Sequence, residues 1–195
     1  VKSLIRSIVL SRTYQLSSHS TAAGNSRAPD NSLFWRMNHR RLDAESIRDA
    51  MLAVSGQLDL TPRKQSVVAE IGDANIGRNL RIDEKINQSN RNRSVYLPIV
   101  RNHLPEFLRV FDFAEPSMIV GRRQETTVPS QALFLLNSPF VIEQAQAMAE
   151  SLLTEEDTAT EMLVTKAYQR ALSRSPTEDE LTRAMKFHQV ALATK

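Results

Sequence analysis

The sequence predicts a mainly α, irregular helical domain with long loops, at most a few short strands and a three-helix segment at its C-terminal end. Three observations predict this class. Apolar residues recur at spacings of three and four in several segments. Capping residues and helix-starting prolines stand at the beginnings of these segments. Polar stretches without large apolar side chains separate them.

The first two helices are predicted in the N-terminal quarter of the chain. Leu4, Ile5 and Ile8 form one apolar stripe, which predicts a helix over residues 2–11. Residues 17–32 lack large apolar side chains and are predicted to be a loop. A second helix starts at Asp43, whose side chain can cap free N–H groups, and it ends before Gly56, where a left-handed residue is favoured.

The middle of the chain is predicted to be irregular. Residues 61–92 are poor in apolar groups and are interpreted as a flexible loop or insertion. Residues 95–100 can form a short edge strand, since Pro98 excludes a central one. A short helix follows around Phe107, where apolar residues recur with helical spacing.

The C-terminal third is predicted to be helical. Pro129 opens a short helix, and Ser138 caps the next one, which has proline at its first position. Asp157 is expected to cap the third helix, and Thr177–Glu180 is a capping box that opens the last one. Residues 138–193 should therefore form three helices packed together.

Length, composition and charge limit the function classes. The chain has 195 residues, 41% of them hydrophobic, and residues 1–195 are expected to form a single domain. The start at Val1 rather than at a methionine suggests a fragment of something longer. No apolar run approaches the roughly 20 residues of a membrane span. The chain has no cysteine, which excludes disulfides and thiolate chemistry within this sequence. The net charge of +3 includes 19 Arg, which either pair internally with carboxylates or meet an anionic partner.

The best candidate binding site is the stretch just before the helix at Pro129. Its guanidiniums, its hydroxyls and the free N–H groups of the helix start can hold a carboxylate, sulfate or phosphate. The predicted ligand-binding residues are Arg122, Arg123, Thr126, Thr127, Arg101 and Asp112. The alternative is an internal brace, in which Arg122 or Arg123 bonds loop carbonyls and Asp112 or Glu125.

A second cluster, on the helix after Asp43, also has two interpretations. Asp43, Glu45, Arg48 and Asp49 follow Arg40 and Arg41. Two of the carboxylates can form the pair that glycoside hydrolysis uses. Capping by Asp43 and pairing of Arg48 with its neighbours explain the same residues structurally, so no catalytic residue is assigned.

The remaining chemistry-bearing residues predict no metal site and no cofactor. The histidines, His19, His39, His103 and His188, lack ligand spacing. The sequence contains no nucleophile elbow, phosphate-binding loop or dinucleotide fingerprint. The aromatic interleaving of a nucleic-acid binder is missing as well. Trp35, Tyr96 and Tyr168 either stack on a sugar ring or fill the core.

Three long motifs carry a family resemblance. They span residues 35–56 (from Trp-Arg-Met-Asn-His-Arg-Arg-Leu-Asp to Ser-Gly), 93–102 (Arg-Ser-Val-Tyr-Leu-Pro-Ile-Val-Arg-Asn) and 121–140 (from Gly-Arg-Arg-Gln-Glu-Thr-Thr-Val-Pro to Asn-Ser-Pro-Phe). Together with residues 167–181 they resemble the planctomycete domain of unknown function 1553. The resemblance covers nearly the whole chain except the polar stretches at 17–32 and 61–92.

The resemblance implies a context rather than a reaction. Such domains stand at the C-terminal end of large exported proteins, periplasmic or at the cell surface, behind a second uncharacterised domain and often a c-type cytochrome domain, where any haem would lie. We therefore expect a non-catalytic interaction domain that docks on upstream domains or on a sulfated or acidic glycan. The alternative is part of a carbohydrate-active enzyme whose site the preceding domain completes.

Overall fold

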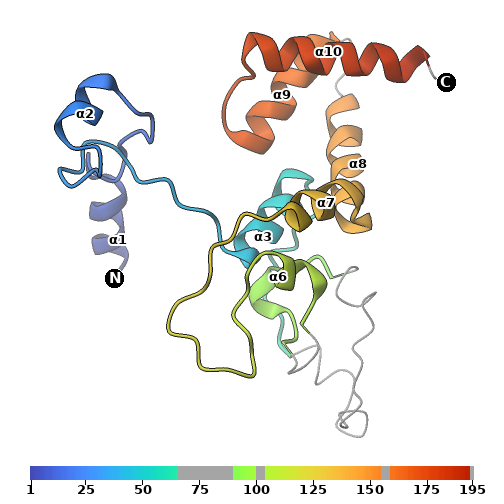
Figure 1. Ribbon diagram of the computed structural model, residues 1–195. Helices are drawn as coiled ribbons and strands as arrows, with labels where there is room; N and C mark the ends of the chain where they lie inside the picture. The colour runs from blue at the N-terminus through green and yellow to red at the C-terminus, as the bar shows by residue number, and fades with distance from the viewer. Residues whose placement is uncertain (66–89, 100–103, 155–158, 194–195) are drawn as a thin grey trace, which may run out of the picture. The chain divides into compact units, whose positions relative to one another are not determined.

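The computed structural model describes residues 1–65, 90–99, 104–154 and 159–193, and within them it confirms the mainly helical class (Figure 1). In this part of the chain the only β-type pairing is one isolated parallel bridge between Asp59 and Asn92. The contacts divide the chain into two compact units, Val1–Arg41 and Leu42–Lys195, each described here by itself. The expectation of one domain stays a prediction.

The N-terminal unit contains two short helices, α1 (Lys2–Val9) and α2 (Ala22–Arg27). The first confirms the predicted helix, and its apolar stripe is exposed. The second corrects the loop prediction for residues 17–32. Local capping explains it, since the Thr21 side chain accepts a hydrogen bond from the Gly24 N–H at 3.2 Å.

The core of the second unit lies between α3 (Ala44–Val54), α6 (Glu106–Val110), α7 (Pro129–Asn137) and α8 (Pro139–Leu153). The Phe107 ring is at its centre, with centroids 4.9 Å from Phe111, 5.6 Å from Phe134 and 5.8 Å from Phe140. The buried core residues are Ala44, Leu52, Leu97, Phe107, Leu108, Phe111 and Phe140.

The two ends of α3 differ from each other in how well the sequence predicts them. Gly56 has φ +77°, which confirms the left-handed turn at the C-terminal end. Asp43 is the N-cap residue, but its side chain makes no capping hydrogen bond. The predicted side-chain cap is therefore wrong, and the Asp43 charge acts on Arg123 instead.

The predicted strand at 95–100 is also wrong over its described residues, where the chain forms the 3₁₀ helix η2 (Ser94–Tyr96). The Ser94 N–H, at the start of this short helix, donates to the Asp49 carboxylate at 2.7 Å. Turn bonds from the N–H groups of Tyr96 and Leu97 then close the short helix. Most of the interpreted loop at 61–92 lies outside the described residues, as does Asp157.

The C-terminal three-helix segment is confirmed. It consists of α8, α9 (Thr160–Leu172) and α10 (Glu178–Ala193), with α9 packed against both others. The capping box is present, because the Thr177 N–H donates to Glu180 at 2.9 Å and the Glu180 N–H donates to Thr177 at 3.3 Å. No helix in the described residues has both the length and the apolar character needed to cross a membrane.

Candidate functional site

The predicted ligand-binding residues gather around the connection between α6 and α7, except Arg101, which lies outside the described residues. Residues 113–127 of this connection, here called the braced loop, run as an extended excursion before α7 (Figure 1). Its base is closed by three polar links that tie it to α3, α6 and α7.

The first link joins the two ends of the braced loop. The Asp112 carboxylate accepts hydrogen bonds from the Thr126 N–H at 2.8 Å and from the Thr126 hydroxyl at 2.9 Å. Asp112 has φ +62°, a conformation that short polar side chains tolerate best. The structure therefore brings together two of the predicted residues, with Asp112 as acceptor.

The second link uses Gln131, a buried residue in the first turn of α7 that our sequence reasoning missed. Its side-chain N–H donates to the Val110 carbonyl at 3.0 Å, and its side-chain oxygen accepts from the Val128 N–H at 3.4 Å. It thereby holds the end of α6 against the start of α7. A Gln at the third position of a helix is a capping-box signal, and this could have identified it.

The third link ties the loop to α3. The Arg123 guanidinium donates to both oxygens of Glu45, at 2.6 and 2.8 Å, and lies over the Phe113 ring at 4.7 Å. Burial raises the pKa of Glu45, but the hydrogen bonds and charge of Arg123 outweigh it and hold that pKa below its usual value. Hydrogen bonding to Glu45, helped by the charges of Glu45 and Asp43, raises the pKa of Arg123.

These links match the brace interpretation for Arg123, with a different carboxylate from those that were considered. The partner is Glu45, 78 positions away, rather than Asp112 or Glu125. Arg122 and Thr127 are exposed beside the braced residues. Whether the predicted set also binds a ligand stays a prediction.

The tip of the braced loop is apolar. Met118 is 70% exposed, Ile119 is fully exposed and Val120 is 41% exposed. A turn precedes them, in which the Met118 N–H donates to the Glu115 carbonyl at 3.2 Å and the Ser117 hydroxyl donates to the Glu115 carboxylate at 2.8 Å. The loop therefore presents three consecutive apolar side chains to solvent from a tied base.

A second polar cluster, around Arg48 of α3, is buried rather than exposed. Arg48 is 3% exposed and donates to the Asn92 carbonyl at 3.0 Å, to the Ser94 hydroxyl at 3.2 Å and to the Asn90 carbonyl. Burial lowers the pKa of Arg48 to about 10, against the opposing attraction of Asp49. Arg48 is thus still a cation at neutral pH, and its charge fixes the backbone of residues 90–94.

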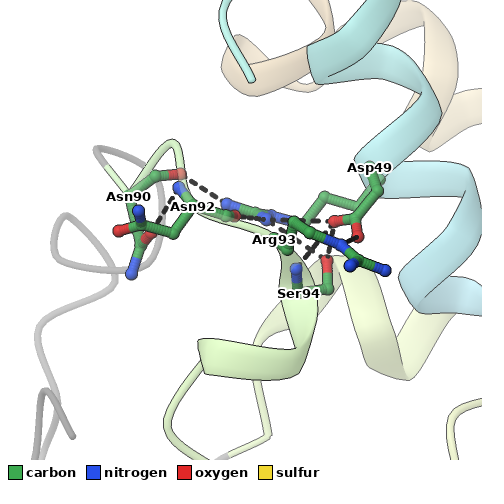
Figure 2. A network of polar contacts seen from close by, with 6 residues as sticks. Asp49, Asn90, Asn92, Arg93 and Ser94 are labelled. Atoms are coloured by element: carbon green, nitrogen blue, oxygen red, sulfur yellow. Dashed lines mark hydrogen bonds and ion pairs between the residues drawn. The ribbon is translucent and has the colours of Figure 1, made fainter. Parts of the chain in front are cut away.

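Asp49 completes this cluster (Figure 2). Its carboxylate accepts from the Ser94 N–H at 2.7 Å and from the Ser94 hydroxyl at 2.6 Å, with Arg48 and Arg93 each 3.8 Å away. Of the carboxylates considered for a catalytic pair, Asp49 is therefore engaged with Ser94 and Glu45 with Arg123. Arg40 and Arg41 belong to the other unit.

A comparison with family models decides what the chain is related to. The model of PSD1, described as a protein of unknown function (DUF1553), matches residues 1–188. The chain belongs to the PSD1 family. No match was found among curated proteins or among solved structures. Membership in PSD1 assigns no activity, and the described residues contain no group of His, Asp or Glu side chains suited to hold a metal ion.

Proposed function

We propose that this PSD1 chain is a non-catalytic interaction domain that docks on an upstream domain of the same polypeptide through the braced loop. One observation carries the proposal. Met118, Ile119 and Val120 stand exposed at the tip of a loop whose base is held by ion-pair and hydrogen-bond links.

The energetics of such a tip favour contact with another protein. Burying an exposed Ile or Met side chain contributes about 1.5–3 kcal/mol. A binding loop normally loses part of this gain because it must be ordered on binding. The links of Asp112 to Thr126 and of Arg123 to Glu45 order the braced loop beforehand, which reduces this ordering cost.

The charges around the tip describe the surface it fits. Arg123 is neutralised by Glu45, whereas Arg122 is exposed close to the apolar tip. A matching surface would therefore have an apolar hollow for Ile119 and a carboxylate for Arg122. A glycan partner for this loop is less well supported, because Arg123 and Thr126 already form hydrogen bonds with Glu45 and Asp112 inside the molecule.

The choice of partner follows from the family context. The resemblance implies a large exported polypeptide with domains that precede this one. Because these domains belong to the same polypeptide, their concentration near the braced loop is high. Covalent linkage converts docking into an intramolecular event with an effective concentration in the millimolar range for short linkers. At such an effective concentration, even a weak apolar contact at Ile119 keeps the two domains docked.

The test is a calorimetric titration of this chain with the upstream part of the polypeptide, which is produced separately. Ile119→Asp should weaken binding at least about tenfold, since a charge would enter the apolar contact. The matched control is Phe187→Asp, which changes another strongly exposed apolar residue, in α10. Circular dichroism should show that both variants keep the native helix content.

Two outcomes would contradict the proposal. One is the absence of any binding between the two parts of the polypeptide in their folded forms. The other is binding that Ile119→Asp and Phe187→Asp weaken equally, because the braced loop would then have no special role.

A further inference from the structure

The N-terminal unit contains an open groove of about 490 Å³ that shares no residue with the braced loop or with the cluster around Arg48. Its lining includes the apolar residues Leu16, Leu33 and Trp35 and the polar residues Ser17, His19, Thr21 and Arg27. All these residues lie within Val1–Arg41, so the groove is formed by one compact unit.

Trp35 is held firmly in this groove. Its indole N–H donates to the Ala28 carbonyl at 2.8 Å. Its ring lies so close to Gly24 that a Cβ atom there would be 2.4 Å from the ring. Glycine is therefore required for this close approach, and the indole forms a wall of fixed position.

The hydroxyl oxygens of the groove each accept one hydrogen bond from the backbone. The Ser17 oxygen accepts from the His19 N–H at 3.1 Å, and the Thr21 oxygen accepts from the Gly24 N–H at 3.2 Å. Because these bonds use lone pairs of the oxygens, each hydroxyl can still donate its proton to a ligand. The exposed Arg27 adds a planar fork of N–H donors.

The positive net charge of the N-terminal unit favours an anionic ligand in the groove. Residues 1–41 contain seven Lys or Arg residues and one Asp, a net charge of +6, while the whole chain carries +3. The one acidic residue, Asp30, does not line the groove, and its carboxylate accepts from the Ser32 N–H at 3.1 Å. The groove itself contains no acidic side chain.

We propose that this groove binds an acidic saccharide, a sugar that carries a carboxylate or a sulfate. A sugar ring has an apolar C–H face, which fits the surface formed by Trp35 and the two leucines. Its hydroxyls fit the donors of Ser17 and Thr21. Its anionic group pairs with the Arg27 guanidinium in the bidentate geometry that carboxylates and sulfates accept.

Single-stranded nucleic acid fits the groove less well. It is anionic too, but its binding sites generally offer successive aromatic side chains on which several bases stack. The lining contains one large aromatic side chain, Trp35, and the smaller ring of His19, but no series of aromatic side chains. Nucleic acid is therefore included in the test as a competing ligand.

The experiment uses the fluorescence of the whole chain, because Trp35 is its single tryptophan. Titration with a uronic-acid or a sulfated hexasaccharide should change the emission in a saturable way. A neutral hexasaccharide should change it much less. Thymidine oligonucleotides of the same charge should bind more weakly than the acidic sugar.

A pair of arginine variants sharpens the test. Arg27→Ala should lower affinity for the acidic hexasaccharide about tenfold, which corresponds to loss of one charge-assisted pairing. Arg12→Ala removes the same charge from an exposed position outside the groove and should leave affinity within about twofold. Circular dichroism should show that both variants keep the native helix content.

Three results would overturn the inference. They are an emission that stays constant at millimolar acidic hexasaccharide, equal effects of Arg27→Ala and Arg12→Ala, and tighter binding of the oligonucleotide than of the sugar. The first two show that the groove takes no acidic sugar, and the third assigns it to nucleic acid. Because Ile119 is in the other unit, loss of docking by the braced loop leaves this inference unaffected.

Discussion

The braced loop and the turn between α9 and α10 each contain an arginine–carboxylate pair with nearly the same geometry. Arg123 meets Glu45 at 2.6 and 2.8 Å, and Arg174 meets Glu180 at 2.7 Å through both nitrogens. The first pair joins positions 78 apart and ties a loop to α3, whereas the second joins positions six apart. Similar chemistry therefore serves tertiary structure in one region and a local turn in the other.

The difference between the two regions is one of surroundings. Arg123 and Glu45 are partly shielded, and Phe113 covers the guanidinium. The Arg174 side chain is about half exposed, with Tyr168 near it, while its partner Glu180 is 22% exposed and Glu45 is 27% exposed, so the difference lies in the two arginines. Water and salt weaken an exposed ion pair more than a shielded one. The distances alone therefore do not tell which pair contributes more to stability.

The largest expected effect comes from a third arginine, which is more buried than either. Arg48→Ala should lower the free energy of unfolding by about 3–5 kcal/mol, because the Asn90 and Asn92 carbonyls lose their donor inside the protein. Urea unfolding measures this loss. Arg93→Ala is the control, since Arg93 is 58% exposed and 3.8 Å from Asp49, and it should cost less than about 1 kcal/mol. Equal losses would contradict the importance of burial.

The next effect tests the braced loop. Arg123→Ala should lower the free energy of unfolding by about 1 kcal/mol, a figure already reduced for the 36% exposure of its side chain. Arg122→Ala, at the neighbouring exposed position, should change it by less than about 0.5 kcal/mol. Thermal unfolding of both variants would measure the contrast. If Arg122→Ala is the more destabilising, the assignment of Arg123 as the brace is wrong.

The smallest effect concerns the local pair and its pH dependence. Hydrogen bonding to Arg174 and to the Thr177 N–H lowers the pKa of Glu180 to about 2. A lowered pKa means that the stabilisation is present above pH 4.5 and is lost as the pH falls through about 2. Glu180→Gln should therefore lower the melting temperature less than Arg123→Ala does at pH 7, and its difference from the wild type should disappear in acid. A difference that persists unchanged at pH 2 would contradict this.

The sequence by itself determined the features that depend on neighbours within one or two turns. The helices from Ala44, Pro129 and Pro139, the left-handed Gly56 and the Thr177–Glu180 capping box were all readable from spacing. Each depends on contacts between residues a few positions apart, and regular helix geometry places such residues together whatever the rest of the chain does. The same local logic identified the stretch before Pro129 as a place of polar chemistry.

Only the tertiary structure decided which partners these residues meet. Pairing of Glu45 with Arg123, and of Arg48 with the backbone near Asn92, joins segments far apart in the sequence. Asp49 accepts a hydrogen bond from the Ser94 N–H at the start of the 3₁₀ helix that stands where a strand was expected. Spacing cannot predict such contacts, because they depend on how the core around Phe107 brings α3, α6 and α7 together. The same packing ties down the base of the braced loop, while its apolar tip stays in solvent.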